Sequence, residues 1–397
     1  MTLKLLNKLY IINGNEEAQQ LFVSDPNLVK GGITQFTSYK LQGAKIPEPI
    51  NRRFRDFDAL RKKFIERWPG VYIPNIPHKK TMGNKDKEIV DLRIEMINRF
   101  LKKLSSIDYL FNSDEMNYFL ENSSNVSKTL DNIKQESYQD LLKKFSNTFT
   151  DYDDNFDTSA GKTEQDNFYK QLCEIYPRLR TFRAFIFQEK ERFKVVQTNY
   201  LAVINMLSLY EKEIMNTFVN NDENKLVFFN MKNIDLCKNI SNAQEKVINP
   251  YDRLYDAITE DYLDTEAMQE ALESLKELQD NYNKLTKNLS SINVQLNDLQ
   301  AGKTNVKNIL RFKGKEDNIN SLLSEKEKLE KDIEYLGQII KIATFNMQNQ
   351  IKKFKMVSLE NYYGELSRIE KDTEINAKIF DELWETVVKD KNISEYN

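Results

Sequence analysis

Arginines, aromatic rings and lysines gather in two segments of this 397-residue chain. The first reads "RRFRDF" over residues 52–57, and the second reads "IPNIPHKK" over residues 73–80. An arginine fork binds phosphate oxygens bidentately, an adjacent ring can lie against a sugar-like face, and a lysine adds a point charge from another side. Prolines give the second segment a rigid path. These groups suit a compact phosphorylated polyol better than a nucleic-acid duplex, which needs a broader basic face.

The positive charge is local. The chain has 58 basic and 61 acidic residues and a formal net charge of −3. Residues 51–103 have 15 Lys or Arg against 7 Asp or Glu, a local net charge of +8. Anion binding must therefore come from this region, and no nucleic-acid partner is expected. Arg53 is expected to contact a ligand, whereas most of the other cations are expected to form a solvated helix face: Arg52, Arg61, Lys62, Lys63 and Arg67.

Residues for catalysis are scarce. His78 is the only histidine, which argues against His-dependent triads and His metal sites. "AGKT" occurs at 160–163 and 301–304, but at both places the upstream glycine of a phosphate-binding loop is missing. Cys173 and Cys237 form no disulfide framework, which favours a reducing compartment. We therefore expect no enzyme, no catalytic residue, no metal and no cofactor.

Glycine and proline divide the chain into two parts. Six of eleven glycines and six of eight prolines lie in the first 83 residues. The first part is typical of turns and short strands, and the second of very long helices. No apolar run approaches the roughly 18 residues of a membrane span, so we expect any membrane contact to be at the surface.

The first part predicts an α+β domain. "QQLFVSD" and "ITQFTSYKLQG" have strand composition, and "PEPINRRFRDF" predicts a third strand that runs into a helix. "DKEIVDLRIEMINRFLKKLSSI" has helical apolar spacing, and "SDEMNYFLE" predicts a short helix with Ser113 as its N-cap. The predicted boundaries are a 1–17 extension, an 18–122 domain and a 123–160 connector.

The connector contains one amphipathic stretch, in which apolar residues such as Leu130, Leu141 and Phe145 share a helix face. Two interpretations stay open. The stretch either packs on a neighbouring domain or lies on a membrane surface, where Lys143 and Lys144 would contact lipid.

Residues 161–391 have heptad-like apolar spacing in three runs, one of which steps from Phe168 to Ile214. Three helices of roughly 60 to 80 residues, each near 100 Å, predict an elongated antiparallel bundle. Pro177 and Pro250 are expected to lie inside helices and bend them. Aromatic-rich seams of this kind leave an apolar strip uncovered, which favours dimerisation.

The loop that joins the second and third helices is basic and partly apolar, "LQAGKTNVKNILRFKGK". It is either a solvated loop or a tip that contacts an anionic membrane. The candidate contacts are Lys303, Lys307, Arg311, Lys313 and Lys315.

"RRFRDFDAL", "WPGVYIPNIPHKK" and the arginine within "DLRIEMINRFLKKL" together resemble the PX (phox homology) domain, in the expected order over about residues 18–122. The resemblance implies that Arg53 binds the 3-phosphate of phosphatidylinositol 3-phosphate and that Phe54 stacks on the inositol ring. Arg93 would bind the 4- and 5-hydroxyls. Arg55 stands where a serine is frequent and adds a phosphate contact.

The same resemblance assigns the 1-phosphate to Lys79, with Lys80 as a substitute. The loop that follows, "TMGNKDKE", departs from the family because Met82 is its only apolar residue for bilayer insertion. Lys85 and Lys87 would help electrostatically. We therefore expect modest membrane affinity for the isolated domain.

A PX domain followed by a connector and three long helices is similar to the sorting nexins with a C-terminal BAR domain. The lysine–phenylalanine spacing, tyrosine pair and late Trp384 of residues 349–387 resemble the last BAR helix. The resemblance implies a crescent-shaped homodimer or heterodimer with another PX–BAR protein, peripheral on the cytosolic face of endosomes. There it would sense or induce curvature in protein sorting and retrograde or recycling transport, with a retromer-like cargo complex as a partner. The alternative is a coiled-coil scaffold or tether that the PX domain recruits without membrane remodelling.

Overall fold

The computed structural model divides the chain into two compact units. Unit 1 contains Met1–Cys173 and Leu263–Lys352, and unit 2 contains Glu174–Tyr262 and Lys353–Asn397. The structure describes residues 21–31, 34–43, 45–76, 87–121, 125–218, 242–243, 245–301 and 315–389.

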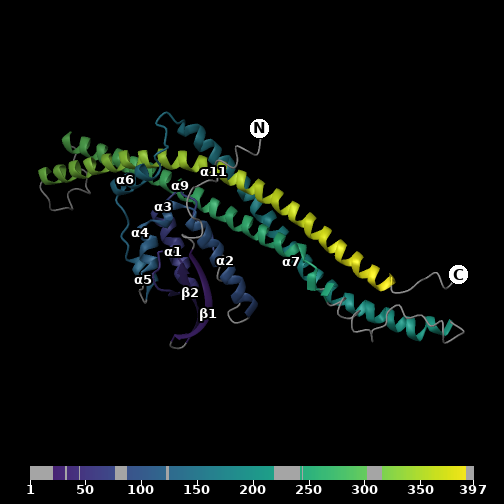
Figure 1. Ribbon diagram of the computed structural model, residues 1–397. Helices are drawn as coiled ribbons and strands as arrows, with labels where there is room; N and C mark the ends of the chain where they lie inside the picture. Colours follow the sequence, from purple (N-terminus) through teal and green to yellow (C-terminus); the bar gives the residue numbers. More distant parts are fainter. Residues whose placement is uncertain are drawn as a thin grey trace. The chain divides into compact units, whose positions relative to one another are not determined.

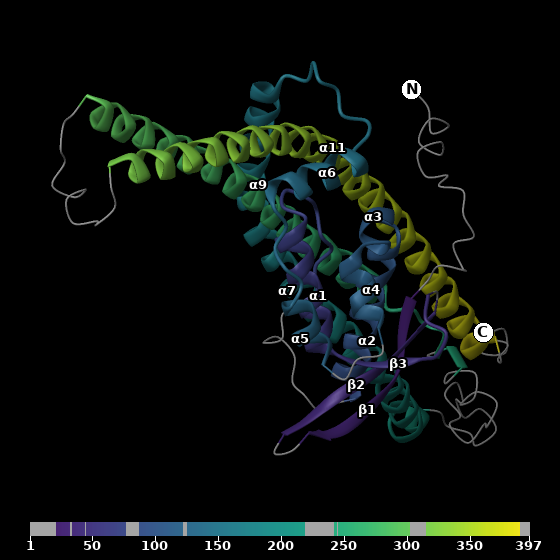
Figure 2. The same cartoon turned by 90° about the vertical axis from the view of Figure 1, so that its left-hand side faces the viewer.

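Unit 1 begins with an antiparallel sheet of three strands in the order β1–β2–β3 (Figure 2). The strands are β1 (Leu21–Gly31), β2 (Thr34–Gly43) and β3 (Ile50–Arg53). The register pairs Leu41 with Ile50 and Ser38 with Arg53. The three strands confirm the sequence prediction, and the register places the last residue of β3 directly beside β2.

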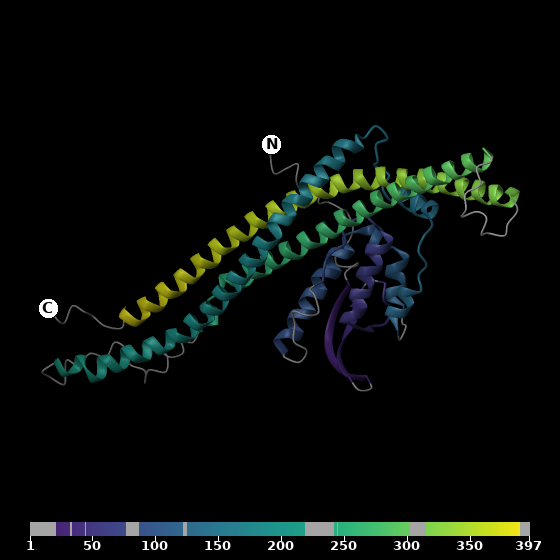
Figure 3. The same ribbon diagram turned by 180° about the vertical axis from the view of Figure 1, so that it is seen from behind.

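Two helices accompany the sheet, α1 (Phe54–Arg67) and α2 (Lys87–Ser105) (Figures 1 and 3). The Asn98 side chain on α2 accepts a hydrogen bond from the Val23 backbone N–H at 2.7 Å and so ties this helix to β1. The core between these elements is apolar and largely aromatic, and its fully buried side chains include Tyr39, Phe57, Leu60, Phe64, Phe100 and Leu101.

Four short helices follow in unit 1: α3 (Asp108–Phe111), α4 (Asp114–Leu120), α5 (Val126–Asp131) and α6 (Tyr138–Thr148). The predicted cap is confirmed, because the Ser113 hydroxyl accepts a hydrogen bond from Met116 N–H. In the connector, Leu130 and Phe145 are fully buried and Leu141 nearly so. Protein therefore covers these apolar side chains, as the packing interpretation expects.

Three long helices complete the described chain: α7 (Thr158–Glu213), α9 (Pro250–Gln300) and α11 (Lys315–Lys389), with the short 3-10 helix η2 (Met215–Phe218) after α7. They have 56, 51 and 75 residues, which confirms the prediction of three very long helices. Each long helix contributes to both units. No helix in the described part of the chain is long and apolar enough to cross a bilayer.

Contacts within each unit show that α7 and α9 run antiparallel. In unit 1, Tyr169 and Cys173 on α7 contact Glu273 and Gln269 on α9 in reversed order. In unit 2 the order is again reversed, since Tyr176 stacks on Tyr262 and Phe187 contacts Tyr255.

The two prolines behave differently from each other. Pro177 lies inside α7, as predicted. The prediction that Pro250 also lies inside a helix is wrong, because Pro250 is the first residue of α9. Proline has no backbone N–H to offer the helix interior and is well tolerated in the first turn. The Asn249 side chain accepts a hydrogen bond from Tyr251 N–H at 3.0 Å and helps to start α9 there.

Candidate functional site

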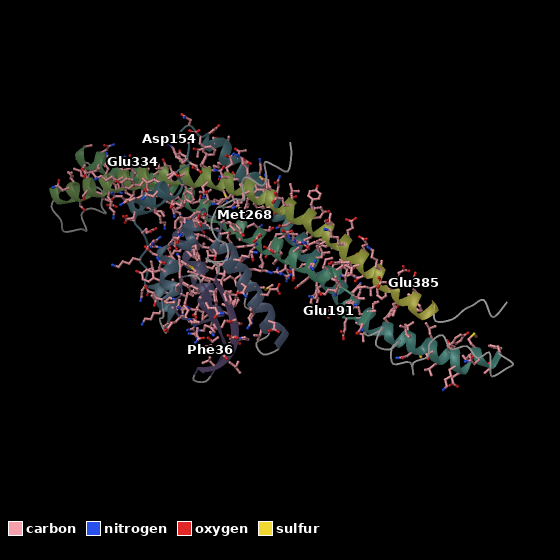
Figure 4. The ribbon with its side chains drawn as sticks, in the orientation of Figure 1. Phe36, Asp154, Glu191, Met268, Glu334 and Glu385 are labelled. Carbon is pink, nitrogen blue, oxygen red and sulfur yellow. The ribbon has the colours of Figure 1, made fainter. Side chains whose placement is uncertain are left out.

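The candidate site begins at the junction of β3 and α1, where Arg53 is the N-cap of the helix. The Arg53 N–H donates a hydrogen bond to the Asp56 carboxylate at 3.0 Å. The Arg53 Nε lies 3.6 Å from the other Asp56 oxygen, and its guanidinium lies over the Phe36 ring at 4.8 Å (Phe36 is labelled on β2 in Figure 4). The Arg53 side chain is still 24% exposed. It is therefore positioned from two sides while part of its donor fork stays accessible.

Arg93 on α2 completes a three-residue cluster. Its guanidinium lies over the Phe54 ring, 5.8 Å from the centroid. Arg93 is only 6% exposed. The first residue of α1 thus contacts Arg93 from α2, and Arg53 precedes it at the end of β3. These are three of the six residues that the sequence assigned to one ligand.

Tyr39 on β2 is part of the same neighbourhood and is fully buried. Burial raises the pKa of its phenol, and the positive charge of Arg93 acts in the opposite direction. The buried cation of Arg93 therefore lies near a phenol that stays neutral.

Asp56 is the acidic residue of the site. Burial raises the pKa of its carboxyl to about 6, although the charges of Arg55 and Arg52 act to lower it. With a pKa of about 6 this carboxyl group is mostly ionised at pH 7, and its single negative charge offsets only one of the three positive charges of Arg53, Arg55 and Arg93. The cluster keeps an excess of positive charge and suits a multiply charged anion.

A family model of the PX domain matches residues 45–123, which include all three residues of the cluster but not β2, which carries Phe36 and Tyr39. Sorting nexin-30 of Xenopus tropicalis is 27% identical over 212 residues, which cover 45% of this chain and 46% of that protein. Sorting nexin-30 of Mus musculus is 32% identical over 132 residues, which cover 29% of this chain and 30% of that protein. The cryo-EM structure of the SNX-BAR Mvp1 tetramer matches with a TM-score of 0.53 and 16% identity, over 93% of this chain and 99% of that chain.

Residues 45–123 thus match the PX domain, and the chain is similar in sequence to sorting nexins and in fold to an SNX-BAR protein. The aligned segments span less than half the length of the two sorting nexin-30 relatives. The low identity to the solved chain shows the fold alone. The domain boundaries predicted at residues 18, 122, 161 and 391 stay predictions.

The positions of the other predicted headgroup and bilayer residues are less complete. Arg55 is half exposed, and its Nε lies 3.8 Å from Asp56. Lys87 is the first residue of α2, and its headgroup-loop role stays a prediction. The predicted residues outside the described part of the chain are Lys79, Lys80, Met82 and Lys85.

The two connector lysines differ. Lys143 is exposed on α6. The Lys144 ammonium instead donates to the Arg67 carbonyl at 2.6 Å and to Glu136 at 2.7 Å, and it lies 4.3 Å from the centre of the Trp68 ring. Burial lowers the pKa of Lys144. Internal partners hold the charge of Lys144, and a membrane role for either lysine stays a prediction.

The prediction of a solvated cationic face on α1 is wrong for most of its members. Arg52, Arg61, Lys63 and Arg67 are all less than a tenth exposed, and only Lys62 has an exposed side chain. Arg67 contacts the carboxylates of Glu115 and Glu136 and the Lys134 carbonyl. A guanidinium has five donors on a long stem, so it can be buried when several acceptors surround it.

Sequence reasoning missed Phe36, Tyr39 and Asp56. Asp56 carries a local signal, because an acid three residues after a helix N-cap has capping-box spacing. Phe36 and Tyr39 reach the site through the pairing of β2 with β3, which leaves no signal near the motif. The basic loop residues Lys303, Lys307, Arg311 and Lys313 lie outside the described residues, and Lys315 is the first residue of α11.

Proposed function

We propose that this protein binds phosphatidylinositol 3-phosphate through the cluster of Arg53, Phe54 and Arg93. The observation that supports the proposal is that Arg93 lies over the Phe54 ring while Arg53, the residue before Phe54, keeps a partly exposed guanidinium. The Arg53 fork binds the 3-phosphate, Phe54 lies against the inositol ring, and Arg93 binds the 4- and 5-hydroxyls. Arg55 adds a phosphate contact.

Lys79 and Lys80 supply the 1-phosphate contact in this proposal, and Met82, Lys85 and Lys87 contact the bilayer beside the headgroup. One headgroup contact is weak by itself. A second contact on a dimer becomes intramolecular, and avidity then rises by orders of magnitude.

We further propose that the BAR region dimerises. In unit 2, six positions of the predicted apolar seam are exposed, five on α7 and Ile214 directly after its end: Ile175, Phe182, Val196, Val203, Tyr210 and Ile214. Exposed apolar side chains that recur along one helix in this way mark an interaction surface. A second PX–BAR chain, identical or related, is the partner that such a seam fits.

Dimerisation has its own test by sedimentation of the full chain over a concentration series. Paired Val196→Glu and Val203→Glu substitutions are expected to convert the dimer to a monomer. Val294→Glu is the control, because Val294 is also exposed but lies on α9 in unit 1. A wild-type chain that stays monomeric at all concentrations would contradict dimerisation.

The resulting function is membrane trafficking on the cytosolic face of endosomes. On this membrane, headgroup binding by the PX domain acts together with attraction between the bilayer and basic residues of the BAR region. Each such Lys or Arg near an anionic bilayer contributes about 1 kcal/mol of binding free energy. Membranes that are both phosphoinositide-marked and curved are favoured, and a retromer-like cargo complex is the expected coat partner.

Liposome co-flotation of the full chain tests the lipid assignment. The vesicles contain phosphatidylinositol 3-phosphate, its 4-phosphate isomer or a charge-matched anionic lipid. We expect binding to the first alone, with loss in Arg53→Ala and retention in Lys62→Ala. Lys62→Ala is the matched control because it also removes one positive charge, at an exposed side chain of the helix that Arg53 caps.

Equal binding to all three lipids would contradict the headgroup assignment. Selective binding without tubulation of the vesicles in electron micrographs would favour the tether alternative.

A further inference from the structure

Three acidic residues of α9, here named the acidic clamp, are Asp264, Glu266 and Glu270. All three belong to unit 1, together with the PX helices. Each contacts a different part of the PX fold. These parts are α1, α2 and the segment 70–76, which leads into the predicted 1-phosphate lysines.

The contact with α1 runs through Arg61. The Arg61 guanidinium donates to the Glu270 carboxylate, and its Nε donates to the Pro74 carbonyl at 2.9 Å. The Arg61 side chain is 9% exposed and the Glu270 side chain 34%, so solvent screens mainly the Glu270 side of this pair. Arg61 lies two turns after Phe54 on the same rigid helix. The Glu270 contact therefore fixes the helix that begins with the candidate ring.

The contact with α2 runs through Lys103. The Lys103 ammonium donates to both oxygens of Asp264, at 2.8 and 2.7 Å. The Tyr72 hydroxyl donates to the same carboxylate at 2.8 Å. Arg93 lies earlier on α2, so Asp264 anchors the helix that carries the buried cation of the cluster.

The segment 70–76 is held along its length. The Asn75 amide donates to Glu266, and Tyr72 N–H donates to the Gln350 side chain of α11 at 2.8 Å. Gly70 has φ +74°, and a Cβ at this position would lie 3.3 Å from the Leu275 side chain. Only a residue without a side chain allows so close an approach to α9 at this φ.

We infer that the acidic clamp positions the headgroup site, so that a helix of the BAR region sets the affinity of the PX domain for its lipid. This inference rests on the proposed function. The helices that begin with Phe54 and carry Arg93, and the segment that leads into the predicted lysines, are each tied to α9. Binding groups must be held within about 0.5 Å of their productive positions to act together. Asp264, Glu266 and Glu270 are positioning residues that do not touch the lipid.

Calorimetric titration of the full chain with soluble dibutanoyl phosphatidylinositol 3-phosphate tests the inference. Asp264→Ala and Glu266→Ala are expected to weaken headgroup binding about tenfold, within the range of coupling between linked sites. Glu273→Gln is the control on the same helix, since Glu273 accepts from Tyr169 on α7 rather than from the PX fold. Its headgroup affinity is expected to equal that of wild type.

Whether headgroup affinity falls or rises in the alanine variants distinguishes a loss of positioning from an effect of net charge. Each alanine variant removes a negative charge from unit 1, and long-range electrostatics alone would then strengthen the binding of an anion. Weaker binding therefore reports lost positioning. The paired exchange Lys103→Asp with Asp264→Lys restores the ion pair and is expected to recover most of the affinity lost in Asp264→Ala.

Circular dichroism establishes that each variant is folded before titration. If Asp264→Ala does not fold, Glu266→Ala still tests the inference. It removes a hydrogen bond to an amide rather than an ion pair, so it is expected to fold and to bind the headgroup about tenfold more weakly than wild type. Folded variants that bind the headgroup as tightly as wild type would overturn the inference alone. A wild-type chain that does not bind the headgroup would overturn the proposed function instead.

Discussion

The two ends of α1 use the same residue type in opposite ways. At the N-terminal end, Arg53 and Arg55 remain 24% and 50% exposed beside a carboxyl group whose pKa is raised to about 6. In the second half, Arg61 and Arg67 are each 9% exposed and contact carboxylates directly. Arg53 and Arg55 keep exposed donors that a ligand can reach, whereas the donors of Arg61 and Arg67 bind acceptors inside the protein.

The difference comes from partners that are distant in sequence. Arg67 contacts Glu115, which is 48 residues away, and Arg61 contacts Glu270, which is 209 residues away. A dense run of cations therefore does not by itself define a ligand surface. What decides the role of each arginine is whether the fold brings an acid or a carbonyl to it.

Of the substitutions that test this difference between the two ends of α1, Arg67→Met is expected to have the largest effect, on stability. It leaves Glu115, which is 2% exposed, buried without its cationic partner. Loss of one member of a buried pair costs about 3–5 kcal/mol of unfolding free energy. Guanidinium unfolding followed by tryptophan fluorescence measures the cost, since Trp68 follows directly after Arg67. A cost below about 1 kcal/mol would place Arg67 with the surface cations instead.

Arg53→Ala has the next largest effect, and it acts on binding rather than on stability. Hydrogen bonds to charged groups contribute about 1.5–3 kcal/mol, so affinity for phosphatidylinositol 3-phosphate vesicles is expected to fall at least tenfold. The unfolding free energy is expected to change by less than about 1 kcal/mol, because the backbone cap survives. A variant that unfolds as readily as Arg67→Met would remove the distinction between the two ends of α1.

Asp56→Asn tests the N-terminal end of α1 through the pH dependence of the unfolding free energy. The pKa of Asp56 is raised to about 6 in the folded chain, above its ordinary value of 3.8. The folded state thus binds a proton more tightly than the unfolded state, and this stability is lost as pH rises through about 6. Relative to Asp56→Asn, wild type is expected to lose about 1–2 kcal/mol between about pH 5 and pH 7.5.

Guanidinium midpoints at the two pH values measure this difference for wild type and Asp56→Asn. Asp58→Asn is the control, since Asp58 is half exposed and pairs with exposed Lys62. Parallel pH profiles of wild type and Asp56→Asn would show that burial does not shift this carboxyl group.

Lys62→Ala has the smallest expected effect. Its ion pair with Asp58 is exposed at both ends, and such pairs contribute about 0–1 kcal/mol. Neither the guanidinium midpoint nor vesicle binding is expected to change measurably. A clear loss of binding would mean that the membrane contacts α1 through its exposed side as well.

Much of the fold could be predicted from the sequence, because local signals define its elements. Strand composition and turn residues marked the three strands, and Ser113 marked the start of α4. Apolar spacing marked the three long helices, although Pro250 was placed inside α9 rather than at its start.

The candidate site was predictable only where it is local in sequence. Arg53 and Phe54 stand side by side in one motif, and the resemblance to the PX domain supplied Arg93. Phe36 and Tyr39 depend on strand pairing, and the burial of Arg61 and Arg67 depends on acids from other elements. The acidic clamp could not be predicted, since the spacing of Asp264, Glu266 and Glu270 is that of any polar helix face.

Calorimetric titration of the full chain with soluble dibutanoyl phosphatidylinositol 3-phosphate, beside its 4-phosphate isomer, tests the central claim most directly. Wild type and Lys62→Ala are expected to bind the 3-phosphate with equal affinity and the isomer far more weakly. Arg53→Ala is expected to lose this preference while it keeps its unfolding midpoint. Equal affinity of wild type for the two isomers, or an Arg53→Ala variant that binds as wild type does, would contradict the assignment of this cluster as the headgroup site.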